Sequence, residues 1–267
     1  MAGAKRRERA YDGGRVWAAL VAQVGQVRAA VAELTDEEWT RPSGLPGWDV
    51  RMLVAHLVRQ VDVVRVVLAE PAPPAGTAVT GLSTWALSTA GIADELDAGT
   101  RETAARTPDV VAALAAAAEG LAAQEQEALR ADRIVPHVFG AMRALDFTVT
   151  RLVELVVHSD DLARATGRDV PLDKQALAAV VRLLADALAV KAPGNSVEVR
   201  VPPYAAVQCV QGPRHTRGTP PNVVETDPLT WIRLATGRTG WASARQDAAV
   251  SASGERADLS PYLPVMS

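Results

Sequence analysis

The sequence predicts a helical bundle followed by a small mixed α+β domain. Up to Gly167, apolar residues recur at three- and four-residue spacing, which is typical of amphipathic helices. After Gly167 the pattern changes, and the alternation typical of half-exposed strands appears beside further helices. We therefore expect residues 1–169 to form an all-helical domain and residues 170–267 a mixed one.

Four long helices are expected in the first part. They are predicted over residues 15–34, 49–68, 107–129 and 142–166. Asp49 can cap the second helix, and Thr107, Pro108 and Asp109 form a cap and first turn for the third. The fourth is apolar on nearly every side, as expected inside a bundle, and Gly167 should end it.

Two connections between these helices carry weaker patterns. Thr35 and Glu38 form a potential capping box for a short helical turn. For residues 77–106 we expect a short helix around Trp85, followed by an irregular segment.

The second part should contain one sheet and two helices. The helices are predicted over residues 174–190 and 227–236, and the strands over 197–201, 204–210 and 249–253. Asp227 is the expected cap of the second helix, with Pro228 in its first turn.

Composition excludes several classes of protein. A net charge of -3 gives no general attraction to a phosphate backbone, so no nucleic-acid partner is expected. The longest apolar run, 110–118, is far shorter than the roughly 20 residues of a membrane span. The basic residues 5–9 are followed by polar residues rather than by an apolar signal segment, so we expect a cytoplasmic protein. The sequence leaves the oligomeric state open, a monomer included.

The single cysteine, Cys209, limits the redox and metal chemistry. It allows neither an intramolecular disulfide nor a zinc cluster of cysteines, so any metal must use His, Asp or Glu. Because it lies in an apolar strand pattern without a cationic neighbour, we interpret it as a core residue rather than a nucleophile.

A metal site is one interpretation of the histidines. Glu154 and His158 lie four residues apart on one face of an apolar helix, where an unpaired carboxylate would be costly. His56 lies in the middle of the second helix and should also face the bundle. Two imidazoles and one carboxylate are the ligands of many catalytic zinc sites, and the same set suits Fe(II).

A structural interpretation stands beside it. Glu154 could be hydrogen-bonded to Arg151 or Arg143, with the two histidines as ordinary helix residues. Asp160 and Asp161 could accept hydrogen bonds from a ligand imidazole or be solvated near the helix end. His137 and His215 occur in loop-like contexts, and we expect both at the surface, the alternative for His137 being the mouth of a pocket.

Two blocks of the first part resemble a known family. The residues LPGWDVRMLVAHL at 45–57 and RLVELVVHSDDL at 151–162 resemble the mycothiol-dependent maleylpyruvate isomerase family of the DinB-like superfamily. The resemblance implies a DinB-like metal-binding four-helix bundle whose metal ligands are His56, Glu154 and His158.

Residues 220–254 resemble bacterial sterol-carrier-like domains, which are the usual C-terminal partner in that family. Together the two resemblances cover nearly the whole chain. They imply a divalent metal, with zinc as the first candidate, which binds the thiol of mycothiol as a thiolate. The thiolate would add to an activated double bond, and rotation and elimination would follow, or it would be transferred to an electrophile.

The family also uses an arginine of the second domain near its site, which would hold an anionic substrate. Arg233, Arg238 and Arg256 are the candidates here. Arg238 is favoured because it follows Gly237 at the expected end of a helix.

Two functions follow as hypotheses. The first is a metal- and mycothiol-dependent isomerase or S-transferase whose partners are a small electrophilic substrate and the low-molecular-weight thiol. The alternative is a non-catalytic sterol-carrier-like protein that binds an apolar ligand or lipid, suggested by the apolar helix and strand content after residue 195.

Overall fold

The structure is a computed structural model that describes residues 9–213 and 221–266. The predictions on the basic residues 5–8 and on His215 fall outside these ranges.

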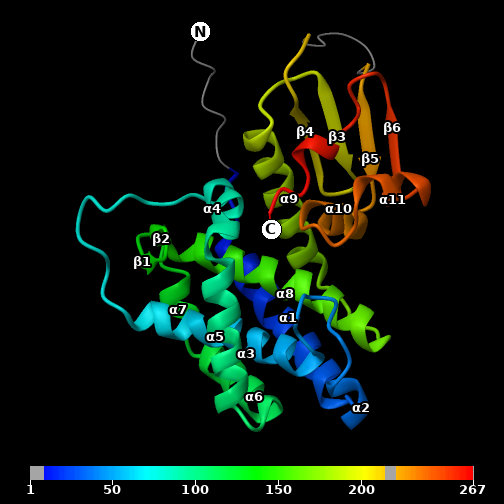
Figure 1. Cartoon of the computed structure of the whole chain (residues 1–267). Helices are drawn as coiled ribbons and strands as arrows, with labels where there is room; N and C mark the ends of the chain where they lie inside the picture. The colour runs from blue at the N-terminus through cyan, green and yellow to red at the C-terminus, as the bar shows by residue number, and fades with distance from the viewer. Residues whose placement is uncertain (1–8, 214–220, 267) are drawn as a thin grey trace.

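Four long helices form a bundle, as predicted (Figure 1). They are α1 (Gly13–Ala32), α3 (Val50–Ala69), α6 (Val110–Ala122) and α8 (Ala144–Thr166). Helices α1 and α3 each pack against both α6 and α8, so that α1 and α3 lie diagonally across the bundle. This arrangement places the middle of α3 directly against the middle of α8.

The ends of these helices follow local capping chemistry. Asp49 caps α3 by accepting a hydrogen bond of 2.8 Å from the amide of Met52. Thr35 and Glu38 form the predicted capping box around the short helix α2 (Asp36–Trp39). Helix α8 ends at Gly167, whose φ of 75° lies in the left-handed region that glycine adopts without strain.

The prediction for residues 77–106 is wrong in its second half. Helix α4 (Leu82–Ser88) contains Trp85 as expected, but a 3₁₀ turn, η1 (Thr89–Ile92), then leads into a regular helix, α5 (Ala93–Arg106). Helix α5 packs on the outside of α3 and buries only Thr100 and Ala104. A helix with so small a buried face shows little apolar periodicity in its sequence.

The third predicted helix needs correction at both ends, and the fourth at its start. Asp109, rather than Thr107, caps α6, and α6 ends at Ala122 before a separate turn, α7 (Glu125–Ala128). An unpredicted antiparallel hairpin, β1 (Ile134–His137) and β2 (Gly140–Arg143), precedes α8. It occupies the first residues expected for the fourth helix, so α8 begins at Ala144.

The second part is a sheet with helices packed against it. Its strands are β3 (Val197–Val201), β4 (Ala205–Cys209), β5 (Val223–Thr226) and β6 (Val250–Ser253), and its helices are α9 (Lys174–Lys191), α10 (Pro228–Ala235), α11 (Trp241–Gln246) and the 3₁₀ turn η2 (Ser260–Tyr262). The strand order is β4-β3-β5-β6, in which β3 and β5 run parallel and the outer pairs antiparallel. The fold class expected from the sequence is confirmed.

Helix α9 joins the two parts. It rises from the bundle along the sheet in Figure 1, packing against α1 and α8 of the bundle and against β4 and α10 of the second part. Trp231 of α10 is buried against it and donates a hydrogen bond of 3.3 Å to the carbonyl of Val181. A division of the chain at residue 170 stays a prediction, since one apolar core runs through both parts.

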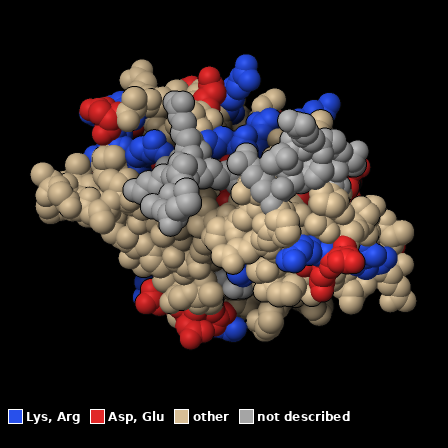
Figure 2. Space-filling model, turned by 90° about the horizontal axis from the view of Figure 1, so that it is seen from above, with Lys and Arg blue, Asp and Glu red and all other residues tan. Residues whose placement is uncertain are grey.

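Two surface properties bear on function. In the described ranges, no helix is both long enough and apolar enough to cross a membrane. On the face shown in Figure 2, basic and acidic side chains lie beside one another rather than in one extended field of either sign.

Candidate metal site

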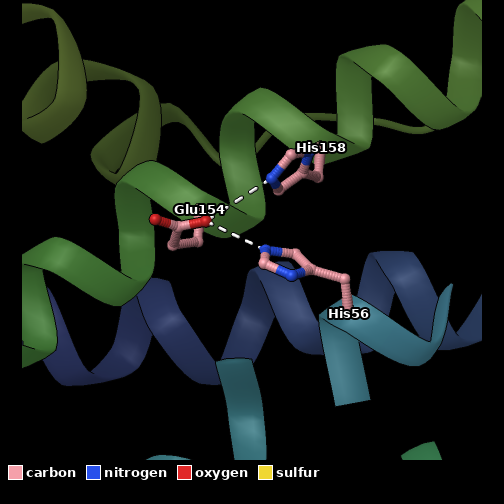
Figure 3. A group of neighbouring side chains, drawn as sticks. All are labelled: His56, Glu154 and His158. Carbon is pink, nitrogen blue, oxygen red and sulfur yellow. Dashed lines mark hydrogen bonds and ion pairs between the residues drawn. The ribbon is translucent and has the colours of Figure 1, made fainter. Parts of the chain in front are cut away.

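His56 reaches the centre of the bundle from α3. It lies on the second turn after the Asp49 cap, and only 3% of its surface is exposed. Glu154 and His158 come from α8, where their four-residue spacing puts both on the face toward α3. They are 9% and 8% exposed. All three predicted ligands are therefore buried and brought together from two helices (Figure 3).

The spacing of the three side chains suits one small cation. Nε2 of His56 lies 3.2 Å from Oε2 of Glu154, and Nε2 of His158 lies 3.4 Å from the same oxygen. The potential ligand atoms all lie within 4.8 Å of one another. Metal–ligand bonds of about 2.0–2.1 Å in tetrahedral geometry separate the ligand atoms by about 3.3 Å. The glutamate–histidine distances match this value without rearrangement.

Hydrogen bonds on the far side of each imidazole determine which nitrogen faces the site. The hydroxyl of Thr100 donates to the carbonyl of Leu96 at 2.7 Å, so towards His56 it can only accept, and Nδ1 of His56 donates to it at 3.1 Å. Nδ1 of His158 donates to Oδ2 of Asp161 at 2.9 Å. In the neutral imidazoles both Nε2 lone pairs therefore point toward the carboxylate of Glu154.

The protonation preferences agree with this picture for His56, whereas the preference of His158 is for the protonated imidazolium, whose Nε2 proton a bound cation would displace. Burial lowers the pKa of His56 to about 4, which keeps the imidazole neutral. Burial would raise the pKa of Glu154, but its contacts with His158 and His56 and the nearby charge of Arg151 outweigh burial and hold that pKa well below 4.5. Burial likewise disfavours the charged form of His158, yet its hydrogen bonds to Asp161 and Glu154 raise its pKa. The cluster is an anionic carboxylate facing two nitrogen ligands, an arrangement that attracts a cation.

The structural interpretation of Glu154 does not match its contacts. Its nearest polar partners are the imidazoles of His56 and His158. Arg151 instead donates to Thr150 and to the side chain of Gln60. Arg143 forms an ion pair with Asp146.

Two arginines of the second part reach α8, and the third candidate does not. Arg238 contacts Asp161 through Nη2 at 3.0 Å and through Nε at 3.3 Å. Arg233 forms a bidentate pair with Asp160 at 2.6 and 2.8 Å. Arg256 stays within the second part, where its side chain donates to the carbonyl of Gln211. Asp161 thus connects Arg238 to His158, whereas Asp160 contacts none of the histidines that the structure describes.

The sequence did not predict that three residues near the site would support it. Thr100, on the unpredicted helix α5, fixes the tautomer of His56. Trp48 stands 5.2 Å from the ring of His56 and donates a hydrogen bond of 2.6 Å to Asp97, also of α5. Gln60 lies one turn beyond His56 and contacts its Nε2 at 3.1 Å. For Gln60 the four-residue spacing was a usable signal, whereas nothing local pointed to Thr100.

The structure also tests the positions predicted for two further side chains. Cys209 is fully buried, as expected for a core residue. His137 lies in β1 rather than in a loop and is half-buried, its ring 5.3 Å from that of Phe139 and 6.1 Å from that of Phe147. Burial, followed by the charge of Arg151, lowers the pKa of His137 to about 4.

Fold and site together define a class of protein: a helical bundle with a buried cluster of two histidines and one glutamate, joined to a small α+β domain. The family model described as the mycothiol maleylpyruvate isomerase N-terminal domain matches residues 20–163, more than half of the chain. The model described as bacterial SCP ortholog matches residues 173–265. The chain therefore belongs to the mycothiol maleylpyruvate isomerase N-terminal domain family.

Solved structures show the same architecture. The crystal structure of the mycothiol-dependent maleylpyruvate isomerase is 15% identical in sequence and superposes with a TM-score of 0.57. The alignment covers 91% of the present chain and 93% of the isomerase chain. A histidine-to-alanine mutant of that isomerase is 14% identical over the same shares, with a TM-score of 0.56. At this identity the likeness establishes the fold. No curated protein matches the chain.

Proposed function

We propose that this chain is a metal-dependent, mycothiol-dependent isomerase or S-transferase that acts on a small electrophile. The observation that carries the proposal is the convergence of His56, Glu154 and His158, with two nitrogen lone pairs and a carboxylate directed at one point. Membership of the mycothiol maleylpyruvate isomerase family supports the choice of thiol.

The three side chains fit a divalent cation, with zinc as the first candidate. They supply three ligands, and catalytic zinc sites of this type keep a further position open. A cation bound there would lower the pKa of a coordinated thiol, so that a thiolate nucleophile exists near neutral pH.

The surrounding residues hold the ligands in a binding-competent state. Thr100 keeps the proton of His56 on Nδ1, and Asp161 does the same for His158, so that both Nε2 atoms remain available. Trp48 packs against the ring of His56, a residue that is 3% exposed.

For Arg238 the contacts support a different role from the one expected. The family resemblance implied that it holds an anionic substrate, but its guanidinium is paired with Asp161. We assign it the role of a positioning residue, which fixes Asp161 against His158 from the second part of the chain. The alternative function, lipid binding, gains no specific observation, because the apolar faces of β3, β4 and α9 pack into the shared core.

The proposal is tested with cobalt-substituted protein. Addition of mycothiol should produce a thiolate-to-cobalt charge-transfer absorption in the wild type and none in His158→Ala. Cys209 is the only cysteine and is buried, so the protein itself should give no such signal before the thiol is added. Mycothiol-dependent turnover of maleylpyruvate is then measured with the zinc protein. Failure to bind a divalent metal near stoichiometry, or a spectrum insensitive to mycothiol, would contradict the proposal.

A further inference from the structure

Gln60 is a buried side chain beside the candidate metal ligands, and the proposed function gives it no role. It lies on α3 four residues after His56, on the same face of the helix, and is 4% exposed. Its side-chain amide has a polar contact at each end, one with the imidazole of His56 and one with the guanidinium of Arg151 on α8. The chemistry of these two partners fixes the direction of the amide.

Arg151 determines which end of the Gln60 amide faces the candidate site. A guanidinium group only donates hydrogen bonds, so the Gln60 atom that faces Nη1 of Arg151 is the carbonyl oxygen Oε1. Arg151 is itself held by a hydrogen bond of 3.0 Å from its Nε to the hydroxyl of Thr150. Its guanidinium carbon also lies 4.8 Å from the centre of the Phe147 ring. The amide nitrogen of Gln60 is therefore the end that points toward the candidate ligands.

The acceptor of the Gln60 amide is the nitrogen of His56 that a cation would use. Because the hydroxyl of Thr100 accepts from Nδ1 of His56, the lone pair of the neutral imidazole lies on Nε2. The amide nitrogen of Gln60 donates to this Nε2 at 3.1 Å. Oε2 of Glu154 lies 3.2 Å from the same nitrogen. Gln60 thus presents an N–H donor at the point where the candidate ligands meet.

This donor loses its acceptor when the site is loaded. The single lone pair of His56 Nε2 can accept from Gln60 or bind a cation, but not both. A buried N–H group without an acceptor costs free energy. In the loaded site, the Gln60 amide, whose direction Arg151 holds, therefore requires another acceptor beside the cation. An anionic group in the open coordination position supplies one.

We propose that the side-chain amide of Gln60 donates a hydrogen bond to the sulfur of the thiol that occupies the open position of the metal site. The inference rests on the proposed function and adds to it a binding residue for the thiolate. A hydrogen bond to a charged acceptor is roughly twice as strong as one between neutral groups. Gln60 therefore favours the thiolate over the neutral thiol.

The test compares Gln60→Met with Gln23→Met in cobalt-substituted protein, with β-mercaptoethanol as the thiol. Gln23 is a buried glutamine of α1 whose amide donates to Ser159 and to the carbonyl of Pro171, so its variant controls for the loss of a buried amide. Titration of the thiolate-to-cobalt absorption should show thiol binding weakened about tenfold or more in Gln60→Met and unchanged in Gln23→Met. The absorption should also move to longer wavelength in Gln60→Met, because a hydrogen bond to sulfur lowers the energy of the electrons that sulfur donates.

Zinc affinity separates this role from support of the ligand histidine. Gln60→Met removes no metal ligand, so a competition titration should give it a zinc affinity close to that of the wild type. Weakened zinc binding together with an unchanged thiol affinity of the cobalt-loaded variant would overturn the inference, since Gln60 would then act only on His56.

A second variant isolates the N–H donor from the contact with Arg151. Gln60→Glu has nearly the same shape and keeps an acceptor for Arg151, but its ionised carboxylate has no N–H group. It should weaken thiol binding at least as much as Gln60→Met, and it tests the inference on its own if Gln60→Met does not fold.

The outcomes distinguish this inference from the proposed function. A wild type that binds neither a divalent metal nor, once loaded, the thiol would contradict both. If the wild type binds both, wild-type thiol affinity in Gln60→Met or Gln60→Glu, or an equal loss in Gln23→Met, would overturn the inference and leave the proposed function standing.

Discussion

Replacing Asp161 by Asn should weaken metal binding without removing a metal ligand. Asp161 is 3% exposed, and its carboxylate accepts hydrogen bonds from Nδ1 of His158 at 2.9 Å and from Nη2 of Arg238 at 3.0 Å. Asparagine has the same shape as aspartate but lacks the negative charge that makes the His158 imidazole a better metal ligand. Its amide nitrogen is a hydrogen-bond donor and therefore cannot accept a hydrogen bond from Arg238.

The magnitude follows from the position of Asp161 directly behind a ligand. Removal of such a supporting acceptor typically lowers metal affinity about 10- to 100-fold, or roughly 1.4–2.8 kcal/mol. The assay is a competition titration of zinc between the protein and a chromophoric chelator of known affinity.

The neighbouring residue provides the control. Asp160→Asn removes an equally charged and similarly buried carboxylate whose partner, Arg233, also comes from the second part of the chain, but which touches no histidine within residues 9–213 and 221–266. It should bind zinc like the wild type. If Asp161→Asn retains the affinity of Asp160→Asn, the proposed relay from Arg238 through Asp161 to His158 is refuted.

Three further predictions concern other parts of the molecule. Thr100→Val removes the acceptor that fixes the ligand histidine of α3, and should weaken zinc binding about tenfold in the same titration. Because it leaves the buried Nδ1–H of that histidine without a partner, it should also lower the unfolding midpoint of the metal-free protein. The hydrogen bond from Arg168 lowers the pKa of the Glu38 carboxyl from 4.5 to about 2, so the ionised form of Glu38 stabilises the fold at neutral pH. The difference in unfolding free energy between wild type and Glu38→Gln, measured by urea titration, should therefore shrink as the pH falls from 4.5 toward 2. A difference that stays constant over this range would contradict the prediction. In Gly254→Ala, at a φ of 98°, the added Cβ would clash with the carbonyl oxygen of Pro221, and the free energy of unfolding should fall by at least about 1–3 kcal/mol. In the control Gly25→Ala on α1, the added Cβ would have no atom within 4 Å, and thermal unfolding should show unchanged or increased stability.

The helices that carry the ligands could be predicted from the sequence because their signals are local. Asp49 and Gly167 mark the ends of α3 and α8 by cap chemistry that needs no tertiary contact. The cost of burying Glu154 in an apolar helix indicated that it needed a partner, and the partners are the two histidines.

The support of the site could not be predicted in the same way. Thr100 belongs to α5, which packs with a small buried face and so lacks apolar periodicity. The pairing of Asp161 with Arg238 spans 77 residues and depends on how α10 and its following turn dock on α8. For Arg238 the sequence could suggest only that it reaches the bundle, because whether it meets a substrate or Asp161 is a matter of tertiary distance.

The central claim is that His56, Glu154 and His158 together bind one divalent cation. Anomalous diffraction at the zinc edge, from crystals of the protein purified with zinc, tests it most directly. We predict one strong peak about 2.0–2.2 Å from Nε2 of both histidines and from an oxygen of Glu154. Zinc-containing crystals in which no peak lies between these three side chains, or in which the metal is bound elsewhere, would contradict the account.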